Sequence, residues 1–67
     1  MSKISERLKE LRLEKELSQT QLSKATEISQ VAINYWENEK RVPNSNAVII
    51  LAKFFGVSTD YLLGVED

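Results

Sequence analysis

The stretch SQTQLSKATEISQVAINYWEN, residues 18–38, decides the fold of this 67-residue chain. Ser18 stands three residues before Gln21, which is the spacing of a capping box at the start of a helix. The apolar pattern of that helix runs out near Glu27, and Ser29 can cap another helix directly afterwards. The sequence therefore predicts two short helices joined by a tight turn.

The second of these helices has two chemically different faces. Ile33 and Trp36 fall on one side, where we expect core packing rather than stacking on a ligand. Leu22 and Ala25 are the expected inward residues of the preceding helix. The other side of the second helix is mostly polar and carries Gln30, Val31, Asn34, Tyr35 and Asn38.

Three further helices are predicted around this pair. Ser2 can cap a first helix, and Pro43 interrupts the chain before an apolar helix that ends at Gly56. Ser58 can cap a last helix, which stops at Gly64. Because no alternating strand pattern competes, we predict an all-α single domain over residues 1–67, with five helices at about 3–15, 19–26, 30–38, 45–55 and 59–63.

The composition excludes several classes of protein. The chain has no Cys and no His, which removes disulfides, zinc fingers and the usual nucleophile–base pairs of enzymes. No apolar run approaches the ~20 residues that span a bilayer, and no signal-peptide pattern opens the chain. We therefore expect a cytoplasmic protein that is not an enzyme, with no cofactor, metal ion, small-molecule ligand or membrane partner.

The charge is nearly balanced but unevenly placed. Nine basic and ten acidic residues give a net charge of −1. Basic residues gather in the first segment and again at Lys40 and Arg41, whereas the C-terminal end is acidic. A nucleic-acid contact needs a local positive surface rather than a positive total. A charge-neutral domain with no implied partner is the alternative.

Four segments carry a resemblance to a known family: RLKELR at residues 7–12, QTQL at 19–22, INYWENEKRVP at 33–43 and LAKFFGVSTDYLLG at 51–64. Together they resemble the Cro/C1-type (lambda-repressor-like, XRE) helix-turn-helix family of phage repressors and bacterial regulators. The resemblance covers about residues 4–64 and implies a compact domain whose second motif helix enters the major groove of DNA.

The resemblance also implies roles for individual residues. Amides suit the N6/N7 edge of adenine, and a valine suits the thymine methyl, although Val31 could instead pack at the start of its helix. Arg12 and Glu37 match a structural salt bridge between the first helix and the recognition helix. We expect DNA base contacts from Gln30, Val31, Asn34 and Tyr35, and DNA phosphate contacts from Gln19, Thr20, Asn38, Lys40 and Arg41.

The chain departs from the family pattern at three positions. Glu27 and Glu39 stand where glycine is usual, and Ser23 stands where alanine is usual. The turn at Glu27 often needs a positive φ, which a residue other than glycine tolerates at a cost of about 1–2 kcal/mol. Together with the near-neutral charge, these departures predict only modest affinity for non-specific DNA.

The apolar helix carries more apolar residues than one buried face requires. Its core positions are Val48, Leu51, Ala52 and Phe55, and a second stripe consists of Ile50 and Phe54. The stripe could be buried under the last helix. We expect instead a homodimer contact, since a large apolar surface favours a partner over water. The predicted dimer interface is Ile50, Phe54, Tyr61 and Leu62.

The leading hypothesis is a sequence-specific transcriptional regulator, a repressor that binds a palindromic double-stranded DNA operator as a dimer. Activation is equally compatible with the sequence. The alternative from another class is a protein-interaction module of the same fold, such as an antitoxin or adaptor. The second apolar stripe and the acidic C-terminus favour that alternative.

Overall fold

The computed structural model describes residues 3–65, which form five helices and no strand. The predicted all-α fold is therefore confirmed. Two helices end one residue earlier than predicted, which is within the usual variation of helix ends. The proposed Ser2 cap lies outside the described residues. The helices are α1 (Lys3–Glu14), α2 (Gln19–Thr26), α3 (Gln30–Glu37), α4 (Ser45–Phe55) and α5 (Thr59–Leu63).

Local hydrogen bonds explain where the helices begin. The Ser18 hydroxyl accepts the Gln21 backbone N–H at 3.0 Å, and the Gln21 side chain accepts the Ser18 N–H at 2.8 Å, which completes the capping box. Ser29 caps α3 and Asn44 caps α4 in the same way, each accepting a backbone N–H three residues on. Each cap satisfies a donor that the first turn of a helix leaves unpaired.

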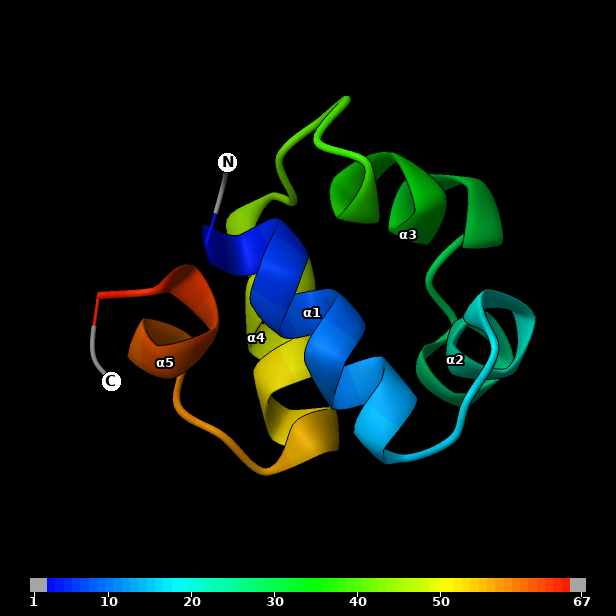
Figure 1. The fold of residues 1–67 in the computed structure, drawn as a ribbon, viewed down its shortest axis with the longest axis horizontal. Coiled ribbons are helices and arrows are strands. Elements are labelled where there is room, and N and C mark those ends of the chain that lie inside the picture. Colours follow the sequence, from blue (N-terminus) through cyan, green and yellow to red (C-terminus); the bar gives the residue numbers. More distant parts are fainter. Residues whose placement is uncertain (1–2, 66–67) are drawn as a thin grey trace.

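The helices surround one apolar core, and Figure 1 shows how they are arranged. α2 and α3 lie on one side of α1 and α4, and α5 lies on the other. α1 packs against both α3 and α5, so it joins the helix-turn-helix to the C-terminal end. The buried apolar side chains come from all five helices: Ile4, Leu8, Leu22, Ile33, Trp36, Ala47, Val48, Leu51, Ala52, Phe55 and Leu62.

Three turns place glutamate in the left-handed backbone region. The φ angles of Glu16, Glu27 and Glu39 are 57°, 62° and 60°. The positive φ expected at Glu27 is thus confirmed, and Glu16, in the turn after α1, has a positive φ that the sequence pattern did not predict. Each such residue costs about 1–2 kcal/mol relative to a right-handed conformation.

Two assignments made from the sequence are wrong, namely Ala25 as a core residue and Leu62 as a residue of the dimer interface. Ala25 is exposed, because the inward side of α2 is formed by Leu22 with the half-buried Ser23 and Thr26. Leu62 is 0% exposed and belongs to the core, so its side chain is not available to a partner subunit. No helix among residues 3–65 is long and apolar enough to cross a membrane.

Candidate nucleic-acid interface

The outward face of α3 carries the residues predicted to read bases. Gln30 is exposed, and Asn34 and Tyr35 are half-buried. Val31 is 55% exposed, so it does not pack into the core. The opposite side of the helix holds the buried Ile33. The amphipathic pattern therefore orients α3 as predicted, with its polar side outward.

The turn between α2 and α3 is held by side-chain hydrogen bonds. The Ser23 hydroxyl donates to the carbonyl oxygen of Ile28. The Thr26 hydroxyl donates to the Leu22 carbonyl oxygen at 2.8 Å and accepts the Ile28 N–H at 3.3 Å. The hydroxyl that Ser23 brings in place of the usual alanine thus has a partner, and the turn fixes the position of α3 relative to α2.

A buried ion pair joins α1 to α3. The Arg12 guanidinium donates to both carboxylate oxygens of Glu37, at 2.7 and 2.9 Å, and to the Leu17 carbonyl oxygen at 2.8 Å. The two side chains are only 10% and 3% exposed. The pKa of Arg12 lies above its ordinary value, chiefly because of the hydrogen bond to Glu37. Burial lowers the pKa of Arg12, and the attraction between the two charges raises it. The pair implied by the family resemblance is present, and it fixes α3 against α1.

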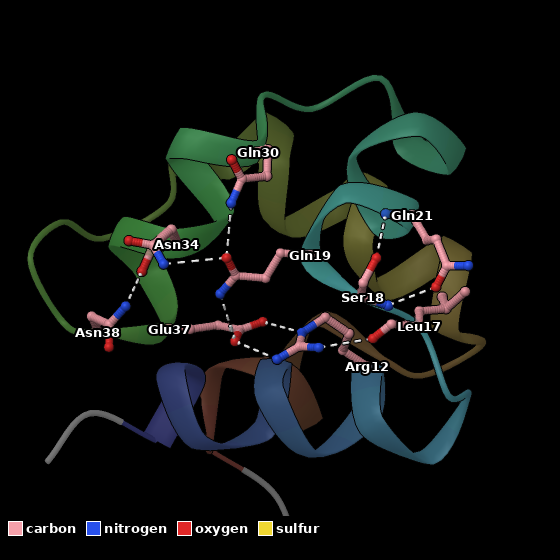
Figure 2. A network of polar contacts seen from close by, with 9 residues as sticks. All are labelled: Arg12, Leu17, Ser18, Gln19, Gln21, Gln30, Asn34, Glu37 and Asn38. Atoms are coloured by element: carbon pink, nitrogen blue, oxygen red, sulfur yellow. Dashed lines mark hydrogen bonds and ion pairs between the residues drawn. The ribbon is translucent and has the colours of Figure 1, made fainter.

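Three amide side chains extend from this ion pair to the surface (Figure 2). The Gln19 Nε2 donates to Glu37 Oε1 at 3.2 Å. The Gln19 Oε1 accepts from Gln30 Nε2 at 3.0 Å and from Asn34 Nδ2 at 3.2 Å. We refer to Gln19, Gln30 and Asn34 as the amide relay. It connects a residue predicted to contact phosphate with two predicted to contact bases.

The sequence did not predict the amide relay. The caps Ser18 and Ser29 make Gln19 and Gln30 the first residues of their helices, and this signal was available in the sequence. However, the cap pattern does not predict the angle between α2 and α3. That angle brings the first residues of the two helices together.

Cationic and polar side chains border the outward face of α3. Lys40 and Arg41 are exposed just after the helix, and the Arg41 guanidinium lies 5.9 Å from the centre of the Tyr35 ring. Thr20 is exposed at the start of α2, and Asn38 Nδ2 donates to the Asn34 backbone carbonyl at 2.9 Å. These side chains give the outward face of α3 a polar border with two cations at one end.

Basic side chains in α1 and just after it make other contacts. Arg7 donates to the Tyr61 carbonyl oxygen at 2.5 Å, and its guanidinium lies 4.1 Å from the centre of the Tyr61 ring. The ammonium of Lys15, the residue after α1, lies 5.9 Å from the Phe54 ring centre. With Arg12 paired to Glu37, these three basic residues are engaged within the domain, whereas Lys40 and Arg41 are exposed just after α3.

Chemically, the arrangement suits the major groove of duplex DNA. A groove about 12 Å wide admits one α-helix, and its base edges are read by side-chain amides and small apolar groups. α3 offers both kinds of group on one exposed face, through Gln30, Asn34 and Val31. The flanking cations are of the kind that contacts phosphate.

Comparisons with known proteins agree with this geometry. A sequence model of the helix-turn-helix family matches residues 8–62. The chain is 40% identical over 63 residues to the transcriptional activator BcrR of Enterococcus faecalis, covering 94% of this chain and 31% of BcrR. It is 34% identical over 62 residues to the uncharacterised regulator YobD of Bacillus subtilis, covering 92% of this chain and 55% of YobD. The chain thus spans only part of these relatives.

One solved structure is similar over almost the whole chain. It is the c2 repressor of phage P22, crystallised in complex with a synthetic operator in the presence of Tl⁺. The TM-score is 0.87 and the sequence identity 32%, over 98% of this chain and 100% of that one. The full repressor protein C2 of Salmonella phage P22 is 35% identical over 60 residues, which cover 90% of this chain and 28% of C2.

Proposed function

Because the chain belongs to the helix-turn-helix family, of the Cro/C1 type, we propose that it is a sequence-specific, double-stranded-DNA-binding transcriptional regulator. The observation that carries the proposal is the exposed face of α3, where Gln30, Val31 and Asn34 stand together beside Lys40 and Arg41. The proposed role is one of binding, with no chemical step, and it is carried out in the cytoplasm.

We assign the proposed contacts by position. Gln30, Val31, Asn34 and Tyr35 face the base edges, because they share the outward side of α3. Gln19 and Thr20 approach phosphate from the start of α2, where the unpaired N–H groups and the helix dipole favour an anion. Asn38, Lys40 and Arg41 approach phosphate beyond the end of α3.

We place repression before activation. A domain that occupies an operator can exclude other proteins without any further contact, and the structural relative is a repressor bound to operator DNA. Activation is the second candidate, since BcrR carries the name of an activator. Measuring transcription from a promoter that contains the selected site, with and without the protein, separates the two.

Truncating either reading amide is expected to relax the sequence preference. Gln30→Ala and Asn34→Ala each remove a side chain able to form two hydrogen bonds with adenine, so discrimination at one base pair falls by about 1–3 kcal/mol. Selection from a random duplex pool, repeated with each variant, measures this. An unchanged preferred site for both variants would contradict the assignment of these residues to base contacts.

Truncating Lys40 or Arg41 is expected to act differently. Either change to alanine weakens binding to all sequences alike and lowers the slope of log K against log salt by about 0.9 per lost phosphate contact. Titrations of a specific and a scrambled duplex at several salt concentrations test this. A variant that changed base preference but not the salt slope would show that the residue reads bases.

A protein-interaction role is the second class of function. Apolar side chains are exposed on α4 and α5, with Ile49, Ile50 and Leu63 between 42% and 44% exposed. The same salt titrations discriminate between the two classes. A pure interaction module should show no preference for one DNA sequence over another at any salt concentration.

We also propose that the regulator binds its operator as a homodimer. Ile50 remains the centre of the proposed interface, together with the half-buried Phe54 on the same helix and the half-buried Tyr61 on α5. Leu62 is excluded by its burial. Ile50→Lys is expected to convert a dimer to a monomer without unfolding it, as sedimentation shows. Leu63→Lys is the matched variant, because Leu63 lines a separate apolar hollow with Ile49. A wild-type protein that sediments as a monomer at high concentration, with and without DNA, contradicts the dimer.

A further inference from the structure

We propose that Glu37 is a positioning residue for base recognition. Its buried carboxylate fixes the orientation of the Gln19 amide. The Gln19 amide then orients Gln30 and Asn34 so that their carbonyl oxygens face DNA rather than the relay. This inference rests on the proposed function, since it concerns how the reading amides are presented to a base.

The first step follows from the chemistry of Glu37. An ionised carboxylate accepts hydrogen bonds and donates none. The Arg12 guanidinium donates two charge-assisted hydrogen bonds to this carboxylate, and the Glu37 side chain is only 3% exposed. The Gln19 amide, 3.2 Å from Glu37 Oε1, therefore has to present its NH₂ group to the carboxylate.

The second step passes this orientation to the reading residues. With its NH₂ group toward Glu37, Gln19 directs its carbonyl oxygen toward α3, as Figure 2 shows. That oxygen has two lone pairs, and they are filled by the NH₂ groups of Gln30 at 3.0 Å and Asn34 at 3.2 Å. Both reading amides therefore donate inward, and each keeps a carbonyl oxygen and a second N–H.

The groups that remain match one purine better than the other. Adenine presents an N–H donor and the N7 acceptor in the major groove, which pair with one carbonyl oxygen and one N–H of an amide. Guanine presents two acceptors, which call for two donors. With one N–H of each reading amide already committed to Gln19, the relay favours adenine over guanine at the bases that Gln30 and Asn34 contact.

The relay also orders the amides before DNA arrives. A free glutamine or asparagine side chain can rotate its amide and offer either end to a base. Here the preferred orientation is set by a charge that is shielded from solvent inside the domain, so little side-chain freedom is lost when the base is bound. Glu37 thus affects the choice of base without contacting DNA.

Glu37→Gln tests the proposal with a side chain of the same shape. An amide at position 37 can donate as well as accept, so Gln19 is no longer held in one orientation. We expect the wild-type site, selected from a random duplex pool, to have adenine where Gln30 and Asn34 read it. The measured quantity is the Kd for a duplex with guanine at those positions divided by the Kd for the duplex with adenine. In the variant this ratio should fall by at least about fivefold, which is the lower end of the discrimination carried by one bidentate pair.

The ratio of two Kd values separates positioning from folding. A partly unfolded population weakens binding to both duplexes equally and leaves the ratio unchanged. Val48→Ala is the matched control, because Val48 lies in the core on α4 and takes no part in the relay. It should lower stability and keep the ratio. If Glu37→Gln does not fold, Gln19→Leu decides the question, since it interrupts the relay and leaves the Arg12–Glu37 pair intact.

A triple variant shows whether the effect passes through the reading amides. In a Gln30→Ala, Asn34→Ala background, Glu37→Gln should change the ratio no further. If the two alanine variants shift the base preference but Glu37→Gln and Gln19→Leu do not, the positioning role is wrong and the proposed function stands. If the alanine variants shift nothing, base reading by Gln30 and Asn34 is itself wrong, and the positioning role fails with it. Selection of guanine at those positions by the wild-type protein also overturns the proposal.

Discussion

Replacing Arg12 by alanine is expected to lower the free energy of unfolding by about 3–5 kcal/mol, because it leaves the buried Glu37 carboxylate without its cation. The side chains are 10% and 3% exposed, so water cannot replace the lost partner. The change also removes the hydrogen bond to the Leu17 carbonyl oxygen. A core of this size rarely supplies more than about 3–5 kcal/mol of net stability. Most of the variant should therefore be unfolded at 25 °C.

Urea denaturation followed by circular dichroism measures this loss. The matched control is the double variant Arg12→Met, Glu37→Leu, in which neither charge remains to be buried. It should recover most of the stability, since apolar replacement of both partners of a buried pair is often neutral. A loss below about 1 kcal/mol for Arg12→Ala would mean that the pair behaves like an exposed one.

Leu62→Ala is expected to cost about 2–5 kcal/mol, the range found when a large buried side chain is truncated and a cavity remains. Leu62 is 0% exposed and belongs to the same core as Leu8 and Leu51. Its neighbour Leu63 is 44% exposed, so Leu63→Ala should change stability by no more than about 0.5 kcal/mol.

The two adjacent leucines also test whether Leu62 lies outside the proposed dimer interface. Thermal or urea unfolding of both variants gives the stability difference, and sedimentation gives the oligomeric state. If Leu62→Ala kept its stability but lost the dimer, Leu62 would belong to the interface after all. Equal destabilisation by the two variants would contradict the burial that separates them.

The helix boundaries could be predicted because their causes are local. Ser18 and Gln21 lie within one turn of each other, and Asn44 meets an N–H three residues away. Gly56 ends α4 with a φ of 70°, which glycine adopts without strain. Such contacts depend on four or five consecutive residues, so they can be found without knowing what packs against the helix.

Inward and outward sides were predictable where a helix carried a clear apolar stripe. Ile33 and Trp36 are buried in α3, and all four core positions assigned to α4 are buried as well. In the eight-residue α2 and the five-residue α5, a single apolar pair does not define the stripe. The angle at which each of these helices meets the core decided that Ala25 is exposed and Leu62 is not.

The sequence by itself determined five helices, the caps Ser18, Ser29 and Ser58, the outward polar face of α3 and, through its resemblance to a family, the Arg12–Glu37 pair. Only the tertiary structure decided that Gln19 bridges this pair to Gln30 and Asn34. The physical reason is distance along the chain. A cap joins residues of one turn, whereas the relay joins side chains 11 to 18 residues apart. Their meeting depends on how α1, α2 and α3 pack together, and that packing is set by the whole core.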